Sequence, residues 1–274
     1  MNVFIVGLGL IGASYAEKLS KGHFTVFGYD HDETVMQKAK DANIIHNTSD
    51  LYAYEKADLI ISALYPDATL QFFKQHGARF KATQTLTDVA GVKTALLKAI
   101  DSTLPANIGY LSHHPMAGKA VPGFDAKEAN LFKGMHFLII KSNRSRAIDH
   151  KRIHTLANAL EVGFVSTMSA KEHDTRIAFT SQLTHVLATT LMHSEPALDT
   201  TKSTGDSFRD LTRIANINAP LWAELFTQNE ACLTEAIERF ELALKTIKKA
   251  IKDCDMETLH AFLKLAKARR KAYD

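Results

Sequence analysis

Two adjacent histidines lie in the segment Ser112-His-His-Pro-Met-Ala-Gly118, directly after an apolar run that we expect to be a strand. Histidine is the usual general base near neutral pH, because its ordinary pKa lies close to that range. In parallel α/β sheets, ligands bind outside the carboxyl ends of the strands. The segment therefore indicates a proton acceptor at a ligand site, with a surface or packing role as the plainer alternative.

A third histidine, His185, lies on a predicted helix that is otherwise apolar. On a helical wheel it shares a face with small and polar residues, and leucines occupy the opposite side. Such a face predicts the wall of a pocket, since an exposed face more often carries Lys or Glu. The small and polar residues are Asp174, Ala178, Ser181, Gln182 and Thr189, and the leucines are Leu183, Leu187 and Leu191.

Two arginines, Arg209 and Arg213, lie four residues apart and so on one face of another predicted helix. The planar guanidinium group can bind both oxygens of a carboxylate at once. The pair therefore indicates a carboxylate site. A surface ion pair with Asp206 or Asp210 is the plainer alternative.

A glycine-rich loop follows the first apolar run, and a second apolar run, Phe24 to Tyr29, ends at Asp30. In a dinucleotide-binding unit the first glycine permits a tight turn, the second admits a pyrophosphate close to the backbone, and the third lets the helix pack on the sheet. An acidic residue at this spacing binds the ribose 2′-hydroxyl. The alternative is a structural turn in some other α/β protein. The predicted cofactor-binding loop consists of Gly7, Leu8, Gly9, Leu10, Ile11 and Gly12.

Asp30 also narrows the choice of cofactor. Its carboxylate would bind a free 2′-hydroxyl and repel a 2′-phosphate, and Tyr29, His31 and Asp32 include no Arg or Lys to offset that repulsion. We therefore expect NAD rather than NADP.

Strand patterns alternate with helical patterns up to residue 168, which predicts an α/β fold with a Rossmann-type, doubly wound sheet. The strand signal then stops, and Ser169-Ala-Lys-Glu172 matches a capping box at the start of a helix. We expect a dinucleotide-binding domain over residues 1–168 and an all-helical domain over residues 169–274. The expected strands are Val3 to Val6, Thr25 to Tyr29, Leu59 to Ala63, Thr85 to Val89, Ile108 to Ser112, His136 to Ile140 and Gly163 to Ser166.

The composition fits a globular enzyme, because 46% of the 274 residues are hydrophobic and 23% are charged. No apolar stretch is long enough for a membrane span, and the opening residues lack the basic start of a secretory signal. The net charge of +3 is too small to indicate nucleic acid, and Cys232 and Cys254 fit reduced thiols in helices. We expect a cytoplasmic enzyme acting on a small molecule, with no metal, membrane or nucleic-acid partner.

One predicted helix carries apolar residues at alternating steps of four and three, which is a heptad seam. Such a seam packs either inside its own domain or against a second subunit, and the sequence leaves both open. The seam consists of Leu233, Ile237, Phe240, Leu244, Ile247 and Ile251.

Taken together, these segments resemble the prephenate dehydrogenases of tyrosine biosynthesis over nearly the whole chain. The glycine-rich loop with Asp30 is generic, but three further blocks in this order are specific. They are His114-Pro-Met-Ala-Gly118; Ser181-Gln-Leu-Thr-His185 with His173-Asp174 upstream; and Phe208-Arg-Asp-Leu-Thr-Arg-Ile-Ala215 followed by Pro220-Leu-Trp222.

The resemblance implies a role for each matching residue. His114 matches the histidine that accepts the proton of the substrate's 4-hydroxyl, and Arg213 matches the arginine that binds a substrate carboxylate. His185 matches a second active-site histidine, at the side-chain end of the pocket. Arg209 stands where some members have a lysine, and Trp222 matches an aromatic residue near the site.

The chain also departs from the family pattern. His113 falls on a position usually held by glycine, so we expect it to neighbour the base. Many relatives have a serine at Gly91 whose hydroxyl supports the catalytic histidine, and Ser112 is a candidate to replace that hydroxyl at the substrate. Many also have an acidic residue where this chain has Ala120, which leaves substrate entry and tyrosine sensitivity open.

The activity implied by the resemblance is NAD-dependent oxidative decarboxylation of prephenate to 4-hydroxyphenylpyruvate, in a homodimer joined through the helical domain. With no further domain expected after the helices, any feedback by tyrosine would act at or near the active site. The same chemistry on arogenate is the first alternative. Hydride transfer on a hydroxy acid or imine is disfavoured by the block at His114, and an inactive NAD-sensing protein by the presence of both base and carboxylate anchor.

Overall fold

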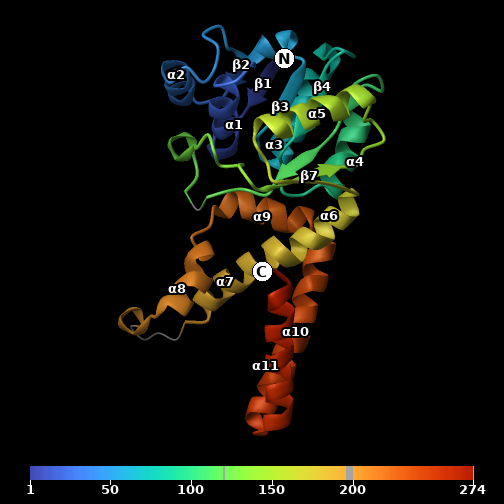
Figure 1. The fold of residues 1–274 in the computed structure, drawn as a ribbon. Helices are drawn as coiled ribbons and strands as arrows, with labels where there is room; N and C mark the ends of the chain where they lie inside the picture. The colour runs from blue at the N-terminus through green and yellow to red at the C-terminus, as the bar shows by residue number, and fades with distance from the viewer. Residues whose placement is uncertain (120, 196–199, 274) are drawn as a thin grey trace.

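The computed structural model describes residues 1–119, 121–195 and 200–273. An α/β domain lies above a group of helices, and two long helices extend away from that group as a hairpin (Figure 1). The predicted fold class is confirmed, since a Rossmann-type parallel sheet is followed by an all-helical C-terminal part.

Five parallel strands form the central sheet: β1 (Asn2–Val6), β2 (Thr25–Tyr29), β3 (Leu59–Ser62), β4 (Thr85–Asp88) and β5 (Gly109–Tyr110). Their order is β2-β1-β3-β4-β5, so the chain changes direction across the sheet between β1 and β3. At such a switch point a crevice opens outside the carboxyl ends of the strands, which is where doubly wound folds bind their ligands.

The sheet is packed on both faces by α1 (Leu10–Ser20), α2 (Glu33–Asp41), α3 (Pro66–His76), α4 (Thr94–Thr103) and α5 (Ala147–Ala159). Successive side chains of a strand point to opposite faces, so β1 contributes to two apolar clusters. Val3 and Ile5 belong to one cluster, and Phe4 and Val6 to the other. The strand that precedes the glycine-rich loop is thus buried on both sides.

A second sheet contains β6 (His113–Pro115), β7 (His136–Ile140) and β8 (Phe164–Met168), with β6 antiparallel and β8 parallel to β7. This corrects the single sheet predicted from the sequence. The strand expected from Ile108 to Ser112 is shortened to β5, and the double histidine belongs to a strand of its own, β6. Because the apolar run continues through Leu111, its periodicity does not mark where the chain passes from one sheet to the other.

The helical part consists of α6 (Ala170–Ile177), α7 (Leu183–His193), α8 (Asp206–Thr212), α9 (Ala219–Gln228), α10 (Glu230–Lys252) and α11 (Met256–Arg270). The predicted capping box is present, since the Ser169 hydroxyl accepts from Glu172 N and Glu172 accepts from Ser169 N. β8 ends one residue before this cap, which supports the proposed domain boundary between residues 168 and 169. Within the described ranges, no helix is long and apolar enough to cross a bilayer.

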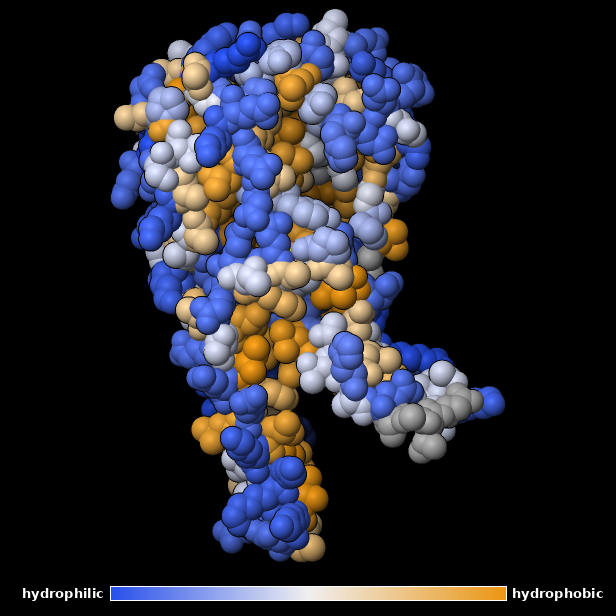
Figure 2. All heavy atoms as spheres, turned by 180° about the vertical axis from the view of Figure 1, so that it is seen from behind, coloured by the Kyte–Doolittle hydropathy of each residue, from blue (hydrophilic) through white to orange (hydrophobic). Residues whose placement is uncertain are grey.

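The heptad seam of α10 divides into two halves. Leu233 is buried, and Ile237 and Phe240 pack partly on a small core shared with α7, so this half has an intradomain role. Leu244 and Ile251 are 52% and 61% exposed. Figure 2 shows apolar side chains gathered along the hairpin of α10 and α11. The most exposed of these are Leu242, Leu244, Ile251, Met256, Leu263 and Leu265.

Candidate active site

The glycine-rich loop joins β1 to α1 at the switch point of the sheet. Gly7 has a φ of +87°, a backbone conformation that residues other than glycine rarely adopt. A Cβ on Gly12 would overlap the carbonyl oxygen of Gly7, whereas one on Gly9 would meet nothing within 4 Å. No side chain caps α1, so its first N–H groups are open to an anion. The loop therefore has the turn, the open approach and the close helix packing that a pyrophosphate site requires.

Asp30 follows β2, and its carboxylate is held against this loop. Oδ2 accepts a hydrogen bond from Leu8 N at 2.7 Å, and Oδ1 accepts one from Asp32 N at 3.1 Å. The Nδ1 atom of His31 lies 3.1 Å from Oδ1. These bonds fix the carboxylate at the end of β2, where a ribose would lie beside a pyrophosphate bound to the loop.

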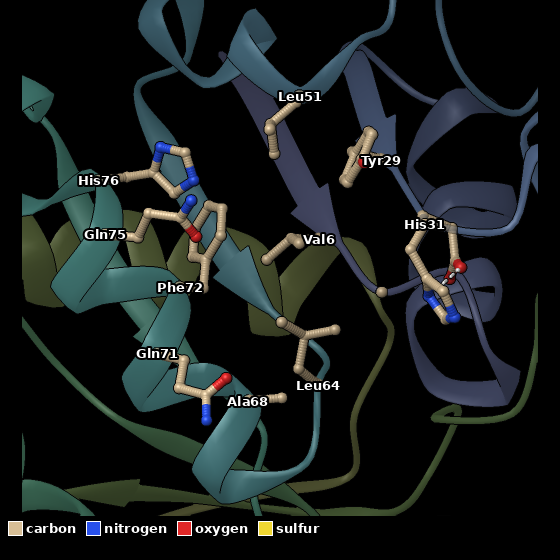
Figure 3. Close-up of a pocket in the computed structure, with 12 residues that line it drawn as sticks. Val6, Tyr29, His31, Leu51, Leu64, Ala68, Gln71, Phe72, Gln75 and His76 are labelled. Carbon is tan, nitrogen blue, oxygen red and sulfur yellow. Dashed lines mark ion pairs between the residues drawn. The ribbon is translucent and has the colours of Figure 1, made fainter.

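A cavity of about 260 Å³ lies beside Asp30. In Figure 3, Tyr29 and His31 lie on one side of it, and Gln71, Phe72 and Gln75 project from α3 on the other. Apolar walls with a few placed polar groups are typical of small-ligand pockets. The dimensions and lining fit the adenosine end of a dinucleotide.

The two histidines of β6 point to opposite faces because strand side chains alternate. His113 is fully buried, with Nε2 2.8 Å from the Tyr15 hydroxyl and Nδ1 2.7 Å from Thr87 Oγ1. Burial, aided by the charge of Lys93, lowers the pKa of His113 to about 3. With both nitrogens bonded inside the protein, this ring has none left for a substrate. Because Tyr15 lies on α1, the contact also ties β6 to the helix that follows the glycine-rich loop.

His114 lies on the other side of β6 and is partly exposed. Its Nδ1 is 2.9 Å from His173 Nε2, and His173 Nδ1 is 2.7 Å from Asp174 Oδ1. Burial, followed by the charges of His173, Lys93 and His113, holds the pKa of His114 well below its ordinary range. The ring is therefore neutral near pH 7 and able to accept a proton.

His173 is not among the residues predicted for the site, and Asp174 is predicted only for the pocket wall beside His185, although both belong to one of the family blocks. Their contact with His114 joins α6 to a strand about 60 residues earlier, and no periodicity reveals such a contact.

A buried ion pair beneath the histidines is also absent from the prediction. Lys93 Nζ lies 2.7 Å from Asp88 Oδ1 and donates to the carbonyl oxygen of His113 at 2.7 Å. Both charged side chains are fully buried. An aspartate that ends a strand, with a lysine five residues later, is the signal that the sequence offers for this pair.

His185, Trp222 and Arg213 come together in the helical part. The rings of His185 and Trp222 stack with centroids 3.6 Å apart and planes inclined by 26°. His185 Nδ1 donates to the Ser181 carbonyl oxygen at 2.9 Å, which leaves Nε2 as an acceptor. Burial lowers the pKa of His185, and the positive charge of nearby Arg213 lowers it further.

A π-helical turn, Ala178–Gln182, separates α6 from α7 and changes the helical phase. The single helical wheel drawn through His185 is therefore wrong across this turn. Gln182, expected on the pocket wall, is buried and donates from Nε2 to the Leu225 carbonyl oxygen at 2.8 Å. Leu225 in turn faces Gly91, beside His114. Since Trp222 and Leu225 are three residues apart on α9, this helix links the two halves of the candidate site.

Two predicted site residues are placed differently. Ser112 is fully buried beside Asp88, its hydroxyl has no partner in hydrogen-bond geometry, and it forms no bond to His114. Arg209 is 68% exposed and lies 4.0 Å from Asp206, which is the surface ion pair considered as its alternative. Ala120 lies outside the described residues.

Two family models cover most of the chain. Residues 15–165 match the model described as prephenate dehydrogenase, nucleotide-binding domain. Residues 169–265 match prephenate dehydrogenase, dimerization domain. The chain belongs to the prephenate dehydrogenase family.

Individual members of the prephenate dehydrogenase family resemble the chain over nearly all its length. The prephenate dehydrogenase of Lactococcus lactis subsp. cremoris is 28% identical over 285 residues, which cover 100% of this chain and 77% of that protein. The cyclohexadienyl dehydrogenase of Zymomonas mobilis is 29% identical, over 99% of this chain and 95% of that protein. The crystal structure of the A. aeolicus prephenate dehydrogenase with hydroxyphenyl propionate and NAD+ is 27% identical, covers 100% of this chain and 98% of that one, and has a TM-score of 0.90.

These similarities confirm the predicted family and support an oxidoreductase. The predicted cofactor, NAD, agrees with the nucleotide-binding domain model and with the NAD+ complex of the A. aeolicus protein. The names of the relatives differ in substrate, so the family alone does not assign one to this chain.

Proposed function

We propose that this protein oxidises and decarboxylates prephenate to 4-hydroxyphenylpyruvate with NAD. The observation that carries the proposal is His114, a partly exposed histidine whose pKa lies well below its ordinary range and whose Nδ1 is already bonded to His173. One ring nitrogen is thus available as a proton acceptor, on a strand tied through Tyr15 to the cofactor-binding helix.

His114 takes the proton of the substrate's 4-hydroxyl as that carbon is oxidised to the ketone level. NAD, when bound, supplies the acceptor for the hydride from the same carbon. Loss of the ring carboxylate as carbon dioxide then completes an aromatic ring. Aromatisation drives this step, so the protein needs no acid to expel carbon dioxide, and its task is to align, deprotonate and hold the substrate.

Arg213 is the proposed anchor for a substrate carboxylate. Its guanidinium lies near the His185 and Trp222 pair and forms no ion pair with any described side chain. A guanidinium can bind both carboxylate oxygens, which fixes the substrate in orientation as well as place. A contact from Arg209 to the substrate stays a prediction.

Arogenate is the second candidate substrate, and the geometry of His185 bears on it. Because Nδ1 of His185 donates to Ser181, Nε2 carries a lone pair that would accept from an ammonium group rather than donate to a ketone. The positive charge of Arg213 beside the same ring opposes an ammonium there. We rank prephenate first because charge repulsion in a partly buried pocket outweighs one hydrogen bond.

A homodimer is the proposed assembly. The helical part matches a dimerization domain, and the outer half of α10 together with α11 exposes a row of large apolar side chains. A second copy related by a two-fold axis would cover them.

The activity is tested by product stoichiometry. Purified protein with prephenate and NAD should release carbon dioxide, NADH and 4-hydroxyphenylpyruvate in equal amounts, measured by absorbance and liquid chromatography. NADH formation without 4-hydroxyphenylpyruvate, or no NADH at all, would refute the proposed reaction.

A further inference from the structure

The hydrogen bonds behind His114 form an ordered series that ends on a carboxylate. His114 Nδ1 is hydrogen-bonded to His173 Nε2, and His173 Nδ1 is hydrogen-bonded to Asp174 Oδ1. His173 is fully buried and Asp174 is 1% exposed. The three side chains are thus held in one arrangement, because water has little access to His173 and Asp174 and cannot replace their hydrogen-bond partners.

Asp174 can only accept in this arrangement. Its Oδ1 accepts from Lys93 N at 2.9 Å and its Oδ2 from Thr94 N at 2.7 Å, at the start of α4. Burial by itself would raise the pKa of Asp174, but the bonds from His173 and Thr94 outweigh it and hold the pKa below its ordinary value. The ionised carboxylate has no proton to give, so His173 Nδ1 must carry the proton of their shared bond.

The positions of the remaining protons follow from the proton on His173 Nδ1. A neutral His173 with its proton on Nδ1 has a lone pair on Nε2, so the partner nitrogen, His114 Nδ1, must donate. The ring proton of His114 therefore lies on Nδ1, and Nε2 of His114 keeps its lone pair. That nitrogen is the one not used inside the protein.

No other described side chain bonds to the His114 ring. Gly91 has no hydroxyl to offer, and the Ser112 hydroxyl is buried without a bond to His114. A Cβ placed on Gly91 would lie 4.0 Å from His114 Cε1 and 3.5 Å from a Leu225 methyl group, so this position has room for a small side chain.

We propose that His173 and Asp174 are positioning residues that fix His114 in the tautomer with a free Nε2. The inference rests on the proposed function, in which His114 is the base. The proton of the substrate hydroxyl passes to His114 Nε2, and the resulting imidazolium donates from Nδ1 to His173. Asp174, two hydrogen bonds away, offsets the new positive charge until the proton leaves to solvent.

The direct test is the protonation pattern of wild-type protein. Nitrogen-15 NMR of histidine-labelled enzyme, with the His114 signals assigned by comparison with His114→Asn, should show a protonated Nδ1 and an unprotonated Nε2 near pH 7. The opposite tautomer, or a mixture of both, would overturn the proposal. This readout requires neither turnover nor a folded His173 variant.

The kinetic test replaces His173 by Ala, with Thr175→Ala as the control, because Thr175 is an exposed residue on the same helix. We expect His173→Ala to lower kcat by about 100-fold while the KM for prephenate and the NADH affinity, measured by fluorescence titration, stay near wild type. An added Gly91→Ser should recover part of the lost kcat. If kcat in His173→Ala remains within about 3-fold of wild type, the positioning role is wrong.

The pH profile separates this role from a general loss of packing. The groups that face the two rings are Lys93 and His113 around His114, and Lys93, Asp88 and Asp174 around His173. Removing the acceptor of the His114 Nδ1 proton and the offset from Asp174 should lower the pKa of His114, so the acid limb of kcat/KM should move to lower pH in His173→Ala. Simple exposure of the ring to water would instead raise this pKa and move the limb to higher pH. An unshifted limb would contradict the proposal. A wild-type enzyme inactive on prephenate and arogenate, by contrast, would refute the proposed function itself.

Discussion

Two neighbouring histidines acquire different chemistry because they lie on opposite faces of one strand. The ring of His113 is enclosed by Tyr15, Thr87 and a stacked Phe137, and its pKa falls to about 3. The ring of His114 faces the helical domain and keeps one nitrogen free. Alternation along a short strand thus divides the pair into a structural residue and a proposed base.

Stability should decrease with falling pH because of His113. In the unfolded chain the pKa of His113 is about 6.5, so the unfolded state binds a proton at this residue below that pH. In the folded state the ring stays unprotonated down to about pH 3. The free energy of unfolding therefore falls as pH drops through this window, by a total on the order of 5 kcal/mol. Urea unfolding at several pH values should show a shallower dependence for His113→Gln than for wild type. Equal slopes would show that His113 takes up its proton in the folded state.

Arg213 should determine substrate affinity. Arg213→Ala should raise the KM for prephenate by the equivalent of about 2 to 4 kcal/mol, because a carboxylate loses a charged, two-point partner in a partly closed pocket. Arg213→Lys should restore only part of this, since an ammonium cannot bind both oxygens in one plane. Steady-state kinetics with prephenate varied at saturating NAD measures both. An unchanged KM in the Ala variant would place the carboxylate elsewhere.

At the scale of elements, the cofactor site is assembled from pieces that each follow from local sequence. The glycine-rich loop needs its positive φ at Gly7 and the absence of a side chain at Gly12. The end of β2 brings Asp30 to Leu8. The cavity beside Asp30 adds α3 from a third segment of the chain.

Cofactor preference is the prediction that belongs to these elements. Asp30→Ala should weaken NADH binding and relieve the repulsion of a 2′-phosphate, so the preference for NAD over NADP narrows. Fluorescence titration of both reduced cofactors against wild type and variant gives the two dissociation constants. Wild-type protein that binds NADPH as tightly as NADH would show that Asp30 does not face the ribose.

The sequence predicts those features that depend on neighbouring residues. The capping box at Ser169 and the strands beside the glycine-rich loop are set by contacts within a few positions. The second sheet, the π-helical turn and the contact of His114 with His173 depend on tertiary packing, which local pattern does not encode. For the same reason the burial of Ser112 and the exposure of Arg209 could not be predicted from the local sequence.

At the scale of the whole molecule, α9 holds the helical part against the nucleotide-binding part. Glu224 accepts from the backbone N–H of Asp67 at the start of α3, and Gln228 donates to the Asp67 side chain at 2.7 Å. Asn218 donates to the Tyr65 hydroxyl at 2.8 Å. These contacts flank Trp222 and Leu225, so the geometry of the proposed substrate site depends on how the two parts meet.

Assembly is the prediction at this scale. Leu244→Glu should shift the protein from dimer to monomer, or make it insoluble, because it places a charge in the exposed half of the α10 seam. Thr246→Glu, on the opposite face of the same helix, is the matched control and should stay dimeric. Sedimentation velocity at micromolar concentration distinguishes these states. If the wild-type protein is a monomer, the proposed homodimer is wrong and the exposed half of the seam is part of the solvent-exposed surface.

The most direct test of the central claim compares substrates in one assay. Initial rates of NAD reduction should be measured with prephenate, with arogenate and with buffer alone, for wild type and His114→Asn. We expect wild type to be fastest with prephenate, and His114→Asn to lose about 100- to 10 000-fold in kcat with little change in KM. Equal NADH formation with and without prephenate, or a His114→Asn variant as active as wild type, would contradict the account.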